Sequence, residues 1–94
     1  MRVTLVNPPS PPAATINREG AAGMGNRYEA AGAFLYPPQT LATAAAVLRA
    51  AGHQPALLDA TAEGLDAEAA LRRVEATAPQ AAVMLLSWSG WEDD

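Results

Sequence analysis

Neutral polar side chains mark three places in the sequence where a ligand could be held. Asn7 follows a short run of leucine and β-branched residues, Thr40 lies at the start of an alanine-rich helical pattern, and Ser87 follows a continuous apolar run. These groups donate and accept hydrogen bonds, and no general base, nucleophile or metal-binding cluster accompanies them. The pattern therefore predicts a site that holds a large neutral or phosphate-containing ligand.

The strand order predicts where these places meet. In open parallel sheets, ligands lie outside the carboxyl ends of the strands, near the point where the strand order reverses. If the strand order is 2-1-3, that point lies between the loops after the first and third strands. The helix start would add free N–H groups and a positive dipole end. We call the predicted ligand-binding residues the rim: Asn7, Pro8, Pro9, Tyr36, Pro38, Gln39, Thr40, Ser87, Trp88 and Ser89.

The elements that must position the rim are predicted to alternate as β-α-β-α-β, which gives an α/β fold with a parallel sheet of three strands. The strands are expected at residues 2–6, 54–59 and 81–86, and the first helix at residues 36–51. Asp66 is predicted to cap the second helix and Pro79 to end it. Its apolar stripe is expected to consist of Leu71, Val74 and Ala78.

Two patterns predict extensive burial. Arg49 is the only charged residue between residues 39 and 51, so we expect the first helix to be covered on most sides. Gly52 is expected in the left-handed conformation just past the end of this helix. The apolar run of residues 81–86 is typical of a parallel strand that is covered on both faces.

The long loop of residues 10–35 is predicted to be a binding loop or a mobile segment, because residues 10–33 show no sustained periodicity. A Gly23-Met24-Gly25 pattern and Asp59 could suggest a dinucleotide site, but Tyr28 replaces the third glycine. We interpret Asp59 as a residue that ties down the next loop. His53 is interpreted as a turn residue and not as a metal ligand.

Composition bounds the function classes. The net charge is −4, the arginines are scattered, and nothing in the pattern indicates a nucleic-acid partner. There are no cysteines, which excludes disulfides, zinc–thiolate sites and an iron–sulfur cluster within this chain. No apolar run reaches the length of about 18 residues that a membrane helix needs. We expect no membrane partner and a cytoplasmic location.

The last predicted strand indicates an unfinished domain. It is the most hydrophobic strand, and no residues follow that could cover its far edge. We expect the chain to be the N-terminal piece of a longer protein. The alternative is a complete small domain that dimerises through that edge.

These motifs together resemble the N-terminal cobalamin-binding domain of cobalamin-dependent radical S-adenosylmethionine (radical SAM) enzymes. The resemblance covers essentially the whole chain. It rests on the Asn-Pro-Pro that follows the first strand, on a Tyr-Pro-Pro-Gln-Thr-Leu-Ala helix start, and on the Leu-Arg-Ala-Ala-Gly-His turn before the second strand; these are residues 7–9, 36–42 and 48–53.

The resemblance implies a Rossmann-like (flavodoxin-like) three-layer sandwich of five strands, of which residues 1–94 supply three strands and two helices. Cobalamin would lie against the strand ends, with Asn7 to Pro9 and Ser87 near its nucleotide tail. In the family, a separate barrel with a Cys-x3-Cys-x2-Cys motif binds a 4Fe–4S cluster and S-adenosylmethionine, and many members are methyltransferases. That catalytic domain is absent from this chain, which contains no cysteine. An Asp-x-His-x-x-Gly motif is also absent, as in this radical branch.

Two other classes of function remain open. The chain could be a small α/β interaction or regulatory domain that binds a protein through its open edge, Trp88 and Trp91. A weaker alternative is a fragment of a nucleotide-dependent enzyme.

Overall fold

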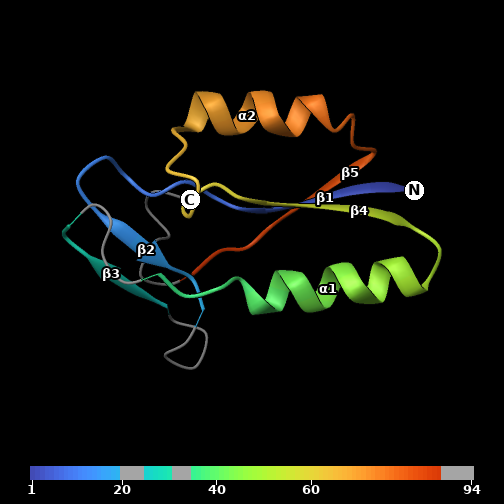
Figure 1. The fold of residues 1–94 in the computed structure, drawn as a ribbon, viewed down its shortest axis with the longest axis horizontal. Helices are drawn as coiled ribbons and strands as arrows, with labels where there is room; N and C mark the ends of the chain where they lie inside the picture. The colour runs from blue at the N-terminus through green and yellow to red at the C-terminus, as the bar shows by residue number, and fades with distance from the viewer. Residues whose placement is uncertain (20–24, 31–34, 88–94) are drawn as a thin grey trace.

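A computed structural model of the protein describes residues 1–19, 25–30 and 35–87. A parallel sheet of three strands in the order β4-β1-β5 forms its centre (Figure 1). The α/β class and the β-α-β-α-β order are confirmed, and the strand order is the 2-1-3 arrangement on which the predicted position of the site was conditional. The strands and helices of this unit are β1 (Arg2–Asn7), α1 (Gln39–Ala50), β4 (Gln54–Asp59), α2 (Ala67–Ala76) and β5 (Ala81–Met84).

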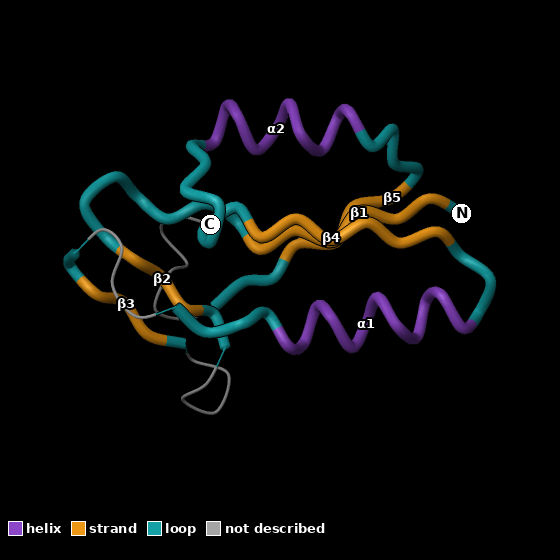
Figure 2. The backbone as a smooth tube through the Cα atoms, viewed as in Figure 1, coloured by secondary structure: helices purple, strands orange, loops and turns teal. Residues whose placement is uncertain are grey.

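The helices lie on opposite sides of the sheet and create three layers (Figure 2). Alternate residues of a strand point to opposite faces, so β1 serves both layers. Val3 and Leu5 pack with Leu41 of α1. On the other face, Val6 packs with Leu58, and α2 adds residues to that cluster. The arrangement is that of a Rossmann-like β-α-β-α-β unit with β1 at its centre.

The long loop contains regular structure that the sequence did not predict. β2 (Thr15–Asn17) pairs antiparallel with β3 (Asn26–Tyr28), and every residue of β2 is buried. This pair lies at the end of the sheet opposite the N-terminus, beyond the carboxyl ends of the parallel strands (Figure 1). Ile16 is fully buried there, which explains why this part of the segment is ordered.

Helix α1 is shorter and more exposed than predicted. It begins at Gln39 and not at Tyr36, so both prolines precede it and Pro38 is the N-cap residue. The expectation that α1 is covered on most sides is wrong. The sheet covers only one face of it, and Val47 on another face is 64% exposed. Gly52 has φ +89°, which confirms the left-handed turn past the helix end.

Helix α2 begins as predicted, because the Asp66 side chain accepts a hydrogen bond from the backbone N–H of Ala69 over 2.7 Å. It ends at Ala76, before Pro79. The predicted apolar stripe is partly wrong. Val74 packs against the core, and Leu71 is exposed and does not.

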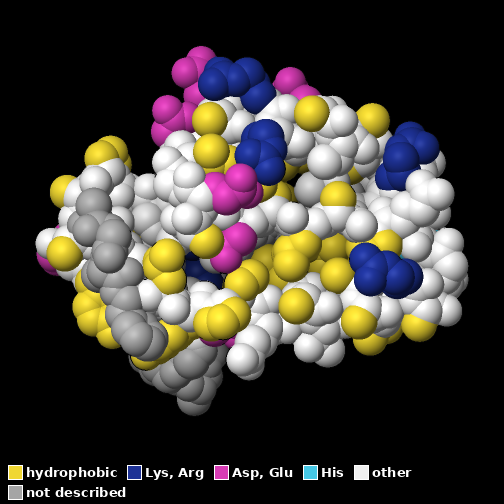
Figure 3. Space-filling model, viewed as in Figure 1, with side chains coloured by type: hydrophobic (Ala, Val, Ile, Leu, Met, Phe, Trp, Pro, Cys, Tyr) yellow, Lys and Arg dark blue, Asp and Glu magenta, His cyan; other side chains and the backbone are white. Residues whose placement is uncertain are grey.

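Strand β5 lies at an edge of the sheet, and the prediction that it is covered on both faces is wrong. It spans Ala81–Met84, and Val83 and Met84 are both exposed. The reason is its position: among the described residues, β5 pairs only with β1, and α1 packs against β1 and β4. Exposed hydrophobic side chains also gather between the two helices on the face shown in Figure 3. Within the described ranges, neither helix is long and apolar enough to cross a membrane.

Candidate functional site

Side chains join the carboxyl ends of β1 and β4. Asn7 and Asp59 are partners in the parallel register, and the Asn7 amide donates to Asp59 Oδ1 over 2.8 Å. The same carboxylate oxygen accepts a hydrogen bond from the backbone N–H of Ala62 over 3.1 Å. Asp59 therefore ties down the loop after β4, and its interpretation as a loop-anchoring residue is confirmed.

Arg18 contributes a buried positive charge at this end of the sheet, and the sequence motifs did not indicate it as a site residue. Its side chain comes from the residue after β2, and the residue is only 3% exposed. Its Nη1 donates to Asn7 Oδ1 over 3.1 Å, to the Pro8 carbonyl over 2.8 Å and, at 3.4 Å, to Thr61 Oγ1. Its Nη2 donates to the Pro9 carbonyl over 3.3 Å. The turn after β1 is therefore bound from the side by one guanidinium group.

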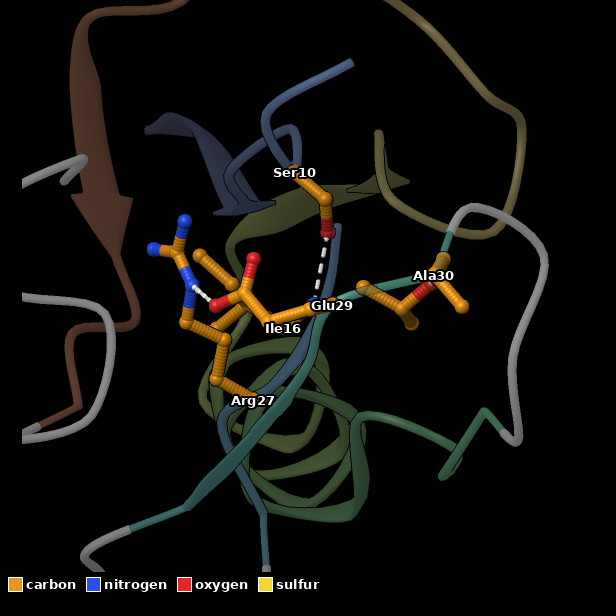
Figure 4. Close-up of polar contacts among 6 residues, drawn as sticks. Ser10, Ile16, Arg27, Glu29 and Ala30 are labelled. Carbon is orange, nitrogen blue, oxygen red and sulfur yellow. Dashed lines mark hydrogen bonds and ion pairs between the residues drawn. The ribbon is translucent and has the colours of Figure 1, made fainter. Parts of the chain in front are cut away.

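Two hydroxyl groups complete this network. Thr61 Oγ1 donates to the Pro8 carbonyl over 2.7 Å and lies 3.0 Å from Ser10 Oγ. Ser10 Oγ also accepts a hydrogen bond from the backbone N–H of Ile16, the central residue of β2, over 2.9 Å (Figure 4). The loop after β4, the turn after β1 and β2 are thus parts of one hydrogen-bonded unit.

Two further contacts involve β3 and the residues that follow it. Arg27 Nε lies 2.6 Å from a carboxylate oxygen of Glu29 in a partly exposed ion pair (Figure 4). The Thr15 hydroxyl donates to the carbonyl of Ala30 over 2.7 Å. Exposed ion pairs contribute little to stability, so the buried contacts of β2 matter more here.

The start of α1 is occupied by a carboxylate of the chain itself. Glu19 accepts hydrogen bonds from the backbone N–H of Thr40 over 2.7 Å and from its hydroxyl over 2.9 Å. The expectation that α1 offers free N–H groups to a ligand is therefore corrected at Thr40. A negative charge is favourable at a helix N-terminus, and here Glu19 supplies it.

The remaining described rim residues lie near the start of α1 or after β5. The backbone N–H of Tyr36 donates to Asn17 Oδ1 over 2.8 Å. Ser87 is buried close to the end of β5, whereas Gln39 is exposed at the start of α1. Pro38 is half-buried. The other predicted rim residues, Trp88 and Ser89, lie outside the described residues, as does Trp91.

His53 has the turn role that the sequence predicted. Its backbone N–H donates to the Leu48 carbonyl over 3.0 Å, which closes the end of α1. Its Nδ1 lies 3.3 Å from the amino group of Met1. Among residues 1–19, 25–30 and 35–87, no group of three or more His, Cys, Asp or Glu side chains could hold a metal ion. The Gly23-Met24 part of the possible dinucleotide pattern lies outside the described residues.

The sequence missed Arg18 and Glu19 because their partners are distant in the chain. One local signal was available: Thr15 and Ile16 are adjacent β-branched residues within a segment otherwise rich in proline, glycine and alanine. Such a pair favours a short strand, and a charged residue directly after a buried strand has to find partners. That signal could have indicated an anchored loop, though not which groups it contacts.

The described part of the site is suited to binding. Neutral hydrogen-bonding groups and backbone carbonyls lie together at the carboxyl ends of β1 and β4. The charged groups Arg18, Glu19 and Asp59 form hydrogen bonds with other residues of the chain. Comparison of the chain with protein-family models, with curated proteins and with solved structures found no match. The proposals below therefore rest on the residues, their geometry and the sequence motifs.

Proposed function

We propose that the chain is a cobalamin-binding module that forms the N-terminal part of a cobalamin-dependent radical SAM enzyme. One observation supports this most directly. The order β4-β1-β5 puts the reversal of strand order between β1 and β5, with Asn7 to Pro9 at the carboxyl end of β1 and Ser87 after β5. Ligands of open parallel sheets bind at such a point, and Asn7 to Pro9 are among the residues that carry the sequence resemblance.

The residues present fit this ligand in a particular way. Both polar groups of the Asn7 side chain already bind Asp59 and Arg18. The turn after β1, whose Pro8 and Pro9 carbonyls bind Arg18, would therefore contact cobalamin through its proline rings, and Ser87 would contact the nucleotide tail. Cobalamin, when bound, supplies a cobalt centre that carries a methyl group in many relatives.

The start of α1 would line the opposite side of the ligand. Tyr36, Pro38 and Gln39 would provide apolar contact and a polar amide, while Thr40 remains bound by Glu19. Trp88 and Ser89 directly follow Ser87 in the sequence and are proposed to extend the same surface. The residues of this chain would bind and orient the cofactor, and the 4Fe–4S cluster and S-adenosylmethionine would be bound by a separate radical SAM domain.

The test is a titration of hydroxocobalamin with the chain, followed by absorbance and equilibrium dialysis. We expect saturable binding that is weakened by Ser87→Ala and unchanged by Thr43→Ala, which alters an exposed residue of α1. The complete reading frame should also encode a Cys-x3-Cys-x2-Cys motif and bind cobalamin. Absence of that motif, or a complete protein that binds no cobalamin, would overturn the proposal. Binding of NADH in place of cobalamin would favour the nucleotide-dependent enzyme.

The exposed edge of β5 favours a second candidate, a small interaction domain that binds a protein strand. Backbone N–H groups alternate in direction along a strand, and that of Leu85 donates to the Val6 carbonyl of β1. The N–H of Met84 therefore points to the open edge, and the residue is 53% exposed. An added strand would use this edge for hydrogen bonds and the exposed apolar side chains for contact.

Met84→Pro tests this candidate because it removes an outward N–H and leaves the pairing with β1 intact. An identified protein partner should be lost with this variant and retained with Leu71→Ser, a matched change at an exposed apolar residue of α2. Equal retention by both variants would exclude binding through the β5 edge.

A further inference from the structure

Arg18 is a buried cation whose described partners are mostly neutral oxygen atoms of the turn after β1. Burial of a charged group is costly unless its hydrogen bonds are satisfied. The guanidinium meets this requirement by donating to Asn7 Oδ1 and to the carbonyls of Pro8 and Pro9. Because this arrangement orders several groups around one side chain, Arg18 defines the local conformation.

The turn needs such a donor because of its sequence. Pro8 and Pro9 have no backbone N–H, so this turn offers carbonyl acceptors without the corresponding donors. A guanidinium group is planar and has five N–H donors in a fixed arrangement, which allows it to bind several carbonyls at once. A lysine ammonium would act as a single compact charge and could not reproduce this geometry.

The residues on both sides of Arg18 extend the same connection to the start of α1. Asn17 accepts the N–H of Tyr36 over 2.8 Å, and Glu19 binds Thr40 twice. Residues 17–19 therefore connect the turn after β1 with the start of α1. These are two of the three parts of the rim, and their separation is set by this short segment.

We propose that Arg18 is the positioning residue of the rim: it holds the turn of residues 7–9 in one conformation and fixes that turn relative to the start of α1. The part of this inference that concerns ligand binding rests on the proposed cobalamin site. The part that concerns the turn does not, because it follows from contacts within the chain. Arg18 acts through the backbone of Pro8 and Pro9, so its effect on cobalamin would be indirect.

The experiment compares the chain with Arg18→Met and Arg18→Lys, and uses Arg72→Met as the control. Met keeps much of the apolar stem of the side chain, and Arg72 is an exposed arginine of α2. Amide hydrogen exchange by NMR reports on the site, because the N–H groups of Ile16 and Ala62 are bound to Ser10 and Asp59 within the connected network. Cobalamin affinity is measured on the same samples at a temperature where each is folded.

We expect Arg18→Met to speed exchange at Ile16 and Ala62 by about tenfold or more, as expected for loss of a hydrogen bond to a charged group. Exchange in α2 should stay within about twofold, and cobalamin affinity should fall by about tenfold. The exchange rates and cobalamin affinity of Arg18→Lys should lie between those of the unaltered chain and of Arg18→Met. Addition of methylguanidinium to Arg18→Met should restore both exchange protection and affinity. General destabilisation would not be repaired by a small guanidinium compound, so this rescue identifies the positioning role.

The outcomes separate the inference from the proposed function. Unchanged exchange at Ile16 and Ala62 in Arg18→Met, or failure of methylguanidinium to restore protection, would overturn the positioning role. Tighter cobalamin binding by Arg18→Met would also overturn it, because residues 17–19 would then obstruct the site. If the unaltered protein binds no cobalamin, the proposed function fails and the exchange data still decide the role of Arg18. If Arg18→Met does not fold, Arg18→Lys provides the same comparison.

Discussion

Glu19 binds Thr40 through both carboxylate oxygens, one on the backbone N–H at 2.7 Å and the other on the hydroxyl at 2.9 Å. The residues lie 21 positions apart in the sequence. Pro38, the N-cap residue of α1, makes no side-chain cap. The first turn of α1 is therefore capped by a residue of the long loop, which couples the stability of the helix to the position of that loop.

Glu19→Ala should lower the free energy of unfolding by about 1 kcal/mol, because it removes a cap and a favourable charge at a helix N-terminus. Urea unfolding followed by far-UV circular dichroism measures this change. Glu75→Ala is the matched control, since Glu75 lies in the last turn of α2, where a negative charge is unfavourable. A loss from Glu75→Ala as large as that from Glu19→Ala would contradict the capping role.

Ile16→Ala should cost about 2–5 kcal/mol, because Ile16 is fully buried and its truncation leaves a cavity. The expected loss would show that β2 belongs to the core of the protein. Val47→Ala should change stability by only about 0.5 kcal/mol or less, because Val47 is exposed. The comparison uses thermal and urea unfolding, and Ile16→Val, with an expected cost of about 0.5–1.5 kcal/mol, serves if Ile16→Ala is unfolded. Equal effects at residues 16 and 47 would refute this assignment.

Asp66→Ala should lower stability by about 1 kcal/mol through loss of the hydrogen bond from the N–H of Ala69. Asp66→Asn keeps an acceptor oxygen at the same position and should retain most of the stability. Unfolding midpoints of the two variants in urea measure the difference. Indistinguishable midpoints would mean that the cap makes no net contribution.

Gly52→Ala should be destabilising by about 1 kcal/mol because its φ of +89° is unfavourable for a residue with a Cβ atom. The cost should come from the backbone alone, since no atom beyond Gly52 and its two chain neighbours lies within 4 Å of the position of an added Cβ. Gly52→Asn should cost less, because asparagine tolerates the left-handed region. Thermal unfolding measures the stability of the two variants. If crowding and not backbone conformation were the cause, Gly52→Asn would be less stable than Gly52→Ala.

The sequence predicted the parts of the fold that depend on local signals. The alanine-rich helical pattern after Thr40 indicated α1, and Gly52 and Asp66 marked an end and a start of the helices correctly. The general rule for ligand sites in parallel sheets then predicted that the polar residues at the strand ends lie at one end of the sheet. These signals act within a few residues, so one sequence is enough to identify them.

The remaining features depend on contacts between distant residues. Arg18 is buried because carbonyls of another segment converge on it, and nothing in its own sequence environment specifies those partners. Glu19 caps a helix that begins 20 residues later by residue number. Val83 and Met84 were expected to be buried because apolar runs usually are, yet their strand is at an edge. Burial is a property of the assembled layers and not of the run itself.

The central position of β1 has a consequence for how the chain folds. β1 is made before its partners, which come much later in the sequence: Arg2 pairs with Gln54, and Val3 with Ala81. Contacts of such large sequence separation slow folding because long segments must be closed before any pairing is gained. During synthesis, β1 would therefore remain unpaired in the sheet until the residues of β4 and β5 have left the ribosome.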